Sequence, residues 1–200
     1  MKNQKKIFML FFLFMQTLNY GQSKTNLNIF KELVDSSVVS FVNYLPSSEN
    51  QINLKLELGT SYSFFSNRIL NDLLKKGIKV HIYPSFKDDV SNVNYTIEEV
   101  KVHYSEIDRD GMFGDFLMPR KLSLKGNFSI DKKNIFTKNF NYTFLDTVNV
   151  NAVKSLENES FPFTKGEVPA EPFFSSITEP VIAISSAAVA VILFFTIRSK

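Results

Sequence analysis

The chain has 200 residues, with 23 lysines and arginines against 20 aspartates and glutamates, and it has no cysteine. The lack of cysteine excludes disulfide bonds and thiolate metal sites, so the hydrophobic core alone must hold the folded domain together. Removing the terminal Lys2, Lys5, Lys6, Arg198 and Lys200 leaves 18 basic against 20 acidic residues. This nearly neutral composition argues against a nucleic-acid-binding protein.

The first segment has the layout of a secretory signal peptide. Lys2, Lys5 and Lys6 precede an apolar run over residues 7–15, and a polar stretch follows it to Gly21. A charged start, a short apolar core and a small residue before the cut are typical of such peptides. We expect cleavage after Gly21, with an uncleaved N-terminal anchor as the alternative. The lack of cysteine excludes a lipoprotein of the bacterial type.

The other end of the chain is predicted to be a membrane anchor. No charged residue occurs from Val181 to Ile197, and Arg198 and Lys200 follow. A helix of this length reaches about 26 Å, at the short end of a bilayer span. We expect a single-pass protein with its bulk in the periplasm and residues 198–200 in the cytoplasm, as the positive-inside rule prefers. The alternative is a buried C-terminal helix of a soluble domain.

Between these ends, the chain alternates at first between helix and strand. Apolar residues recur at helical spacing over residues 26–45 and again up to Lys76, and they alternate with polar ones over 52–58 and 78–82. Gly77 suits the left-handed position after a helix. A strand, a helix and a strand in this order usually give parallel neighbouring strands.

From Asn92 onward the pattern changes to long strands. Alternation over residues 93–104, 122–130 and 136–144 predicts an antiparallel meander, and Glu98–Glu99 shifts the parity as a bulge does. The predicted fold class is α+β, a mixed α/β two-layer sandwich with about five strands, two helices on one face and a C-terminal transmembrane helix. The domain is expected over residues 22–147.

Residues 148–180 lose periodicity and contain four prolines, so they are predicted to form a tether between the domain and the membrane. Four phenylalanines are unusual in a free linker. We expect them to pack on the domain or on a partner at the membrane surface. They are Phe161, Phe163, Phe173 and Phe174.

Catalytic and metal-binding signatures are weak. His81 and His103 are isolated on strands, and Asp108–Gly111 begins like a calcium loop without its remaining ligands. No phosphate-binding loop, dinucleotide fingerprint or nucleophile elbow occurs. We therefore expect no cofactor, no metal and no enzymatic activity, although an enzyme of unrecognised type is an alternative.

A long apolar loop is the predicted partner-binding surface. Residues 105–119 join two hairpin strands, and such long loops are uncommon unless they have a function. The loop could fold over the sheet edge, or it could contact a partner or the membrane. The candidate binding residues are those of this loop and of the tether: Met112, Phe113, Phe116, Leu117, Phe161, Phe163, Phe173 and Phe174.

Two resemblances extend these expectations. The element order over residues 26–147 resembles the amino-terminal domain of TolB, the periplasmic domain of the curli secretion channel and auxiliary transport lipoproteins. The segments 109–114, 156–164 and 179–199 look like those of an uncharacterised family of exported, C-terminally anchored proteins of the Bacteroidetes–Chlorobi group. That family implies no catalytic residue.

The sequence thus favours a non-enzymatic envelope protein whose periplasmic domain binds another envelope component. The alternative is a carrier of a small ligand or lipid, with a phenylalanine-lined pocket between the helices and the sheet. Small residues four apart, Ala183 with Ala187 and Ser186 with Ala190, also suggest a homo-oligomer through the C-terminal helix.

Overall fold

The structure is a computed structural model. It describes residues 23–47, 49–82, 84–111, 114–132, 134–170 and 175–198. Several predictions fall outside the described residues: the signal peptide over residues 1–21, Met112, Phe113, Phe173, Phe174 and Lys200.

Helix α2 (Asn26–Val42) begins at a side-chain cap. The Thr25 hydroxyl accepts a hydrogen bond from the Asn28 amide at 3.3 Å, which satisfies one of the free donors at the helix start. Apolar side chains recur every three or four residues, so they form one buried stripe. The stripe consists of Ile29, Phe30, Leu33, Val34, Val38 and Phe41.

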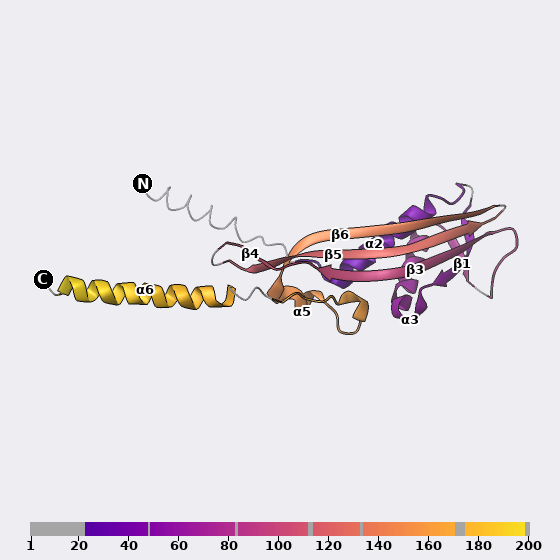
Figure 1. The fold of residues 1–200 in the computed structure, drawn as a ribbon. Helices are drawn as coiled ribbons and strands as arrows, with labels where there is room; N and C mark the ends of the chain where they lie inside the picture. Colours follow the sequence, from indigo (N-terminus) through magenta and orange to yellow (C-terminus); the bar gives the residue numbers. More distant parts are fainter. Residues whose placement is uncertain are drawn as a thin grey trace, which may run out of the picture.

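Strand β1 (Gln51–Glu57) lies between β2 (Lys79–Ile82) and β3 (Ser91–Tyr104) and runs parallel to both. The prediction of parallel neighbours joined by a helix is therefore confirmed. Figure 1 shows these strands at one end of a long twisted sheet, with helix α2 behind it. Alternating burial follows from the pleat, because successive side chains of a strand point to opposite faces.

The connection from β1 to β2 is helical but interrupted. It consists of α3 (Gly59–Tyr62), the 3-10 turn η2 (Ser63–Phe65) and α4 (Ser66–Lys75). Gly77 has a φ of 79° after α4, as expected of a left-handed residue at a helix end. The interruption leaves Phe65 fully buried while Phe64 is 41% exposed.

Strands β3, β5 (Phe116–Asp131) and β6 (Ile135–Asn149) form the predicted antiparallel meander. The register between β3 and β5 shifts between Ile97 and Glu99, which confirms the predicted bulge. The bulge changes which side chains of β3 face the core. Before it the odd-numbered residues are buried, and after it the even-numbered ones are.

The predicted fold class needs a first correction in its strand count. Strand β4 (Asp108–Arg109) pairs with Leu117 and Phe116 of β5, so the sheet has six strands rather than about five. Two residues are too few for an alternating pattern to reveal. The expected long loop over 105–119 is accordingly shorter, because it contains β4 and the first residues of β5.

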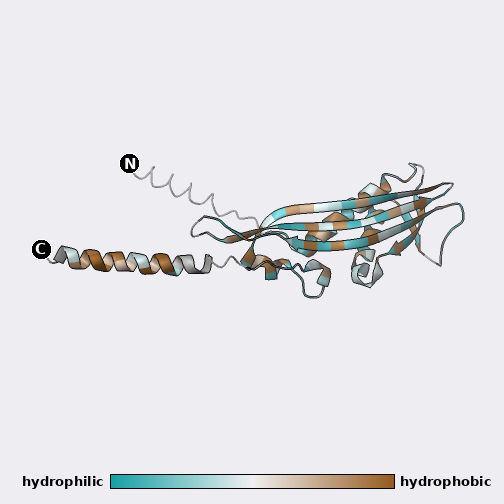
Figure 2. Cartoon of the chain, viewed as in Figure 1, coloured by the Kyte–Doolittle hydropathy of each residue, from teal (hydrophilic) through white to brown (hydrophobic). Residues whose placement is uncertain are grey.

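The second correction concerns the predicted transmembrane helix over Val181–Ile197. Helix α6 (Ser175–Arg198) occupies this segment, and its apolar side chains lie exposed. Searched over the described residues, no helix has both the length and the apolar character that a membrane crossing needs. Pro180 lies inside α6, and the apolar run after it falls short of the roughly 20 residues of a typical span. Figure 2 shows brown, apolar turns of α6 separated by paler ones.

The predicted tether over residues 148–180 overlaps folded structure. Its proposed boundary at residue 147 falls inside β6, and the chain then forms η3 (Val150–Ala152), α5 (Val153–Leu156) and η4 (Pro162–Thr164). Val153 and Leu156 are 7% and 4% exposed. This stretch therefore belongs to the domain.

The core lies between α2, α4 and one face of the sheet. The sheet contributes alternate residues of its central strands, and Figure 2 shows the resulting stripes of apolar and polar residues. These side chains fill the layer between helices and sheet. Its largest fully buried members include Tyr95, Phe30, Phe41, Phe65 and Phe128.

Gly126 is required by close packing at the bulge. It pairs with Ile97 on β3 and with Phe140 on β6. A Cβ at this position would lie 2.1 Å from the Thr96 carbonyl oxygen and 2.6 Å from Cζ of Phe140. The Phe140 ring thus occupies the space that a side chain at residue 126 would need.

We expect Gly126→Ala to lower the free energy of unfolding by about 1–3 kcal/mol, because overpacking forces the strands apart. Chemical unfolding of the full chain, followed by circular dichroism, measures this loss. Ser129→Ala on the same strand is the control and should stay within about 0.5 kcal/mol of the wild type. Equal effects of the two changes would contradict the packing argument.

Candidate functional site

The candidate site is a groove between the α3–η2 turn and the segment that follows α5. Two features build it: a compact turn over residues 157–166, and a cluster of aromatic rings. A buried polar network fixes the turn on the domain.

The turn over residues 157–166 is closed by its own hydrogen bonds. The hydroxyl of buried Thr164 accepts a bond from the Asn158 amide at 2.9 Å. The Thr164 amide donates to the Phe161 carbonyl at 2.9 Å, and the Gly166 amide donates to the Glu157 carboxylate at 2.9 Å. The segment is thereby held in one compact conformation although it contains little regular structure.

A buried arginine anchors this turn to the domain. The side chain of Arg120, on β5, is 0% exposed and forms two hydrogen bonds with the Asp146 carboxylate on β6, at 2.9 and 2.6 Å. Its remaining terminal nitrogen donates to the Lys24 carbonyl at 3.0 Å and to Oδ1 of Asn26 at 2.6 Å. A buried charge is tolerated only when it is paired and hydrogen-bonded in this way.

Asn26 connects Arg120 to the turn. Its Nδ2 donates to the Thr164 carbonyl at 2.7 Å and to the Tyr104 hydroxyl at 3.1 Å. Burial raises the pKa of Tyr104 to about 12, so the phenol stays neutral at physiological pH. The start of α2, the strands β3, β5 and β6, and the turn are thus joined by one network.

Aromatic rings pack the turn against the helices. The Phe163 ring centroid lies 5.4 Å from that of Phe65, 5.7 Å from Tyr62 and 6.0 Å from Phe30. Phe161 is half-buried, with its ring centroid 4.5 Å from that of the exposed Phe64. Such offset and edge-to-face contacts are favourable beyond the area that they bury. Phe163 therefore holds the turn in place, whereas Phe161 and Phe64 form the outer wall of the groove.

The groove between these rings has a volume of about 540 Å³. Hydroxyl groups alternate with aromatic rings around it, so it offers apolar contact together with hydrogen bonds. Its lining residues are Thr60, Ser61, Tyr62, Ser63, Phe64, Val100, Ser160, Phe161, Pro162 and Phe163. None of these ten side chains carries a carboxylate, an imidazole or an amine.

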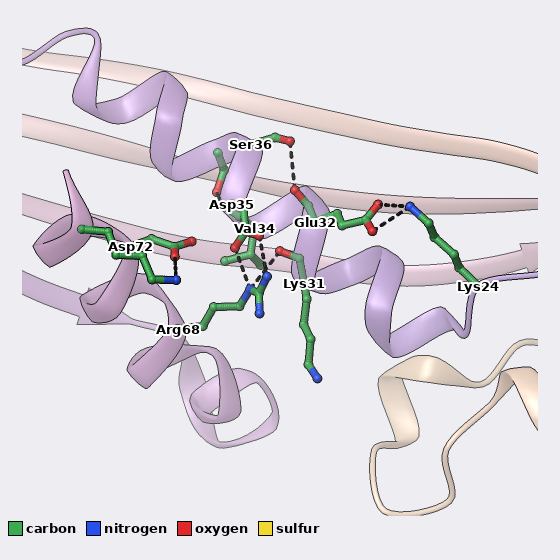
Figure 3. A network of polar contacts seen from close by, with 10 residues as sticks. Lys24, Lys31, Glu32, Val34, Asp35, Ser36, Arg68 and Asp72 are labelled. Atoms are coloured by element: carbon green, nitrogen blue, oxygen red, sulfur yellow. Dashed lines mark hydrogen bonds and ion pairs between the residues drawn. The ribbon is translucent and has the colours of Figure 1, made fainter.

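A second hollow of about 400 Å³ shares Ser63 and Phe64 with the groove, and its other lining residues have polar or charged side chains. Its lining includes Lys31, whose Nζ is 5.6 Å from the Phe64 ring centroid, and also Arg68, Asp72 and Lys75. Figure 3 shows the polar contacts here: Arg68 on α4 reaches across to Asp35 on α2, with Nε 2.6 Å from the carboxylate. These contacts join α4 to α2.

The pKa values of two carboxyl groups in this network are shifted in opposite directions. For Asp35, burial raises the pKa, but the hydrogen bonds to Arg68 and Asp72 outweigh burial and leave the pKa below its usual value. Burial, followed by the hydrogen bond and negative charge of Asp35, raises the pKa of Asp72. Folding therefore favours the protonated form of Asp72 relative to the unfolded chain.

The residues predicted from sequence do not all come together. Phe161 and Phe163 lie at the groove. Phe116 and Leu117 are half-buried in β5, where the Arg109 guanidinium lies 5.0 Å from the Phe116 ring. Val181 is 52% exposed on α6, and Ile197 and Arg198 are at the end of that helix.

The histidines lie apart from the groove lining. His81 contacts the Gln51 side chain at 3.3 Å, and His103 is exposed on β3. Within the part of the chain that the structure describes, no group of three or more histidine, aspartate or glutamate side chains is placed to hold a metal ion.

Sequence reasoning missed Arg120, Asn26, Tyr62 and Phe64. Only Arg120 left a usable signal. Leu122 and Leu124 of β5 face the core. Because every second residue of a strand lies on the same face, residue 120 lies on the buried face as well. A charged residue at such a position indicates a paired, structural site.

Comparisons with known proteins give little guidance. No family model and no curated protein matches the chain. Among solved structures, a minor lipoprotein from Acinetobacter baumannii is 15% identical with a TM-score of 0.36, over 53% of this chain and 70% of that one. The rare lipoprotein B from Shewanella oneidensis is 14% identical with a TM-score of 0.33, over 70% of this chain and 98% of that one. These structural neighbours are lipoproteins, but the likeness is too low to support an assignment. The predicted resemblances stay predictions.

We expect Asp146→Asn to destabilise the protein by about 3 kcal/mol, because it leaves the buried Arg120 guanidinium without its counter-charge. The double variant Arg120→Met with Asp146→Asn should lose little more free energy of unfolding than either single variant, since both changes act on one interaction. Chemical unfolding measures these losses. Glu32→Gln, which removes an exposed ion pair with Lys24, should cost less than about 0.5 kcal/mol. Additive losses in the double variant would contradict the coupling.

Asp72→Asn should raise the melting temperature at pH 7. Because the folded pKa of Asp72 is raised, its contribution to stability is full below its unfolded pKa of about 3.8 and is lost as the pH rises through the folded pKa. The side-chain amide of the variant does not ionise, so this loss of stability does not occur. The gain in melting temperature should therefore vanish near pH 3, where Asp72 is protonated in both states. Thermal unfolding between pH 3 and 7 tests this. A gain that does not depend on pH would show that the carboxyl pair is not its source.

Proposed function

We propose that this chain is a non-enzymatic binding protein of the cell envelope, whose domain binds another envelope component at the aromatic groove. The observation that carries the proposal is the wall formed by Phe64 and Phe161, whose ring centroids are 4.5 Å apart beside a groove of about 540 Å³. Aromatic rings that line a concave surface and keep part of their area exposed are typical of binding sites.

The groove suits a ligand with an apolar group and a few polar atoms. The rings of Phe161 and Phe163 offer apolar area, and the hydroxyls of Ser61, Ser63 and Ser160 can accept or donate hydrogen bonds. An apolar side chain of an extended protein segment meets both requirements. Phe163 and the Arg120 network hold the turn that carries Phe161 in place, which lowers the entropy lost on binding.

The composition of the lining favours binding over catalysis. General acid–base and nucleophilic catalysis need a titratable group within hydrogen-bond reach of the reacting atom. Tyr62 is the only ionisable side chain among the ten lining residues, and its hydroxyl lies 3.3 Å from the Val100 amide. The groove therefore lacks a base that could activate a nucleophile.

The envelope location rests on the N-terminal sequence pattern. A lysine-rich start followed by an apolar run is what export of the domain requires. A domain without cysteine also needs no oxidative step to fold outside the cytoplasm.

The alternative of an internal ligand pocket gains no support. It requires free space between the helices and the sheet. That layer is filled by side chains with no exposed surface, such as Phe30, Phe41 and Phe128.

The proposal is tested by native purification of the tagged full chain from the cell envelope, with quantitative mass spectrometry of what accompanies it. Phe64→Ser with Phe161→Ser should lower recovery of the bound component about tenfold or more, because the two rings form the binding wall. Leu74→Ser, at an apolar residue 57% exposed on α4 and outside the groove, should leave recovery unchanged. Full recovery by a folded double variant would remove the groove from the proposal.

A further inference from the structure

Strand β6 forms one border of the sheet and is unusually regular. Its fifteen residues pair with β5 in unbroken register, from Asn149 opposite Leu117 to Ile135 opposite Asp131. Within the described part of the chain, no second strand pairs with β6 (Figure 1). Alternate N–H and C=O groups of β6 therefore point away from the sheet and are free to form a further ladder.

This border lacks the usual protection against strand addition. Natural edge strands are short, contain proline or several charges, or are bent by a bulge. Residues 135–149 contain no proline and no glycine, and their register with β5 shows no shift. The only charged residues are Lys138 and Asp146.

The positions of these two charges are self-complementary. Tyr142 is the midpoint of β6, and Lys138 and Asp146 each lie four residues from it, on opposite sides. An antiparallel pair of two β6 strands with all fifteen residues overlapped would place Lys138 of each copy directly opposite Asp146 of the other. Opposite charges at such positions are favourable, and like charges are not.

The neighbouring positions agree with the same register. On the helix-covered face it places Phe140 opposite Phe144 and Phe136 opposite Val148. On the uncovered face it pairs polar residues with one another or with an exposed leucine or isoleucine, without any charge. These pairs are Thr137 with Thr147, Asn139 with Leu145, Asn141 with Thr143 and Ile135 with Asn149.

We propose that β6 pairs with the β6 strand of a second copy of this chain, antiparallel about a two-fold axis at Tyr142, so that the two sheets become one. Such an interface is isologous, the commonest kind in soluble oligomers, because one surface serves both copies. The charge pattern favours a second copy over an unrelated strand, since full overlap and charge pairing coincide in one register. This association does not depend on the aromatic groove.

Both charged side chains remain available to the second copy. Lys138 contacts Tyr44, with its Nζ 4.2 Å from the ring centroid, at the rim of the domain. The Asp146 side chain is 26% exposed while it holds Arg120. Each carboxylate can accept further hydrogen bonds beyond the two from Arg120.

Cysteine cross-linking tests the register directly, because the chain has no cysteine of its own. The full chain with Asn139→Cys and Leu145→Cys is oxidised with copper–phenanthroline and run on a non-reducing gel. Directly opposite residues have Cα atoms about 4.5–5.5 Å apart, within the range of a disulfide. We expect a dimer band at least about fivefold stronger than that of the control below.

The matched control is Asn139→Cys with Thr143→Cys, which brings its cysteines only to diagonal positions, about 7–8 Å apart and too far for a disulfide. Equal cross-linking of the two variants would overturn the proposed register. No cross-linking of either variant, or a wild-type chain that stays monomeric at all concentrations in ultracentrifugation, would overturn the self-pairing. Capture of a strand from another protein in place of a second copy would overturn it as well.

A charge change gives an independent check. Lys138→Glu places like charges opposite each other twice in the dimer, so the dimer dissociation constant should rise about tenfold. Lys154→Glu makes the same change at an exposed residue of α5 and should have no effect. Thermal unfolding shows whether both variants are folded. An unchanged dissociation constant for folded Lys138→Glu would contradict the proposed pairing.

Discussion

The structure depends on keeping one buried positive charge satisfied. The Arg120 guanidinium has no exposed surface, and its partners come from Asp146, Asn26 and the Lys24 carbonyl. These partners lie far apart in the sequence, on β6 and at the start of α2. The geometry of the guanidinium, with five donors in one plane, fixes how these elements meet. Hydrophobic packing has no such direction, so it could not set their relative positions as sharply.

The aromatic groove is a consequence of this arrangement. Asn26 accepts a hydrogen bond from Arg120 and donates one to the Thr164 carbonyl, so the turn that carries Phe161 and Phe163 is held where α2 begins. The interrupted helix between β1 and β2 supplies Phe64 and Tyr62 from the other side. The groove thus lies where a non-regular turn meets an irregular helix, and the polar network holds the wall that the turn provides.

The regular parts of the fold could be predicted from the sequence because their patterns are long. The apolar stripe of α2, the alternation in β3, β5 and β6 and the parity change at Glu98–Glu99 each extend over many residues. Strand β4 has two residues and left no pattern, so the strand count was wrong. The transmembrane prediction used the uncharged run of residues 181–197, which is at the short end of a bilayer span, and this run together with Pro180 inside α6 does not make a helix with the length and apolar character of a membrane crossing.

The candidate site was harder to predict than the fold. Phe161 and Phe163 could be predicted as contact residues because they are aromatic residues in a proline-containing stretch. Their partners Tyr62 and Phe64 lie about a hundred residues away in the sequence, and no local pattern indicates that they meet. The sequence around Asn26 indicates only the start of a helix. The role of Asn26 depends on contacts with Tyr104 and Thr164 that only the tertiary structure creates.

The insertion of β1 between β2 and β3 has a consequence for how the chain reaches this structure. The hairpin of β5 and β6 closes a short turn, so its pairing costs little chain entropy. The pairing of β1 with β3 instead closes a loop that contains α4 and β2. Long-range parallel contacts of this kind form late and slow the folding of a domain. During synthesis, the edge of β1 that pairs with β3 therefore stays without its partner strand until the later strands emerge.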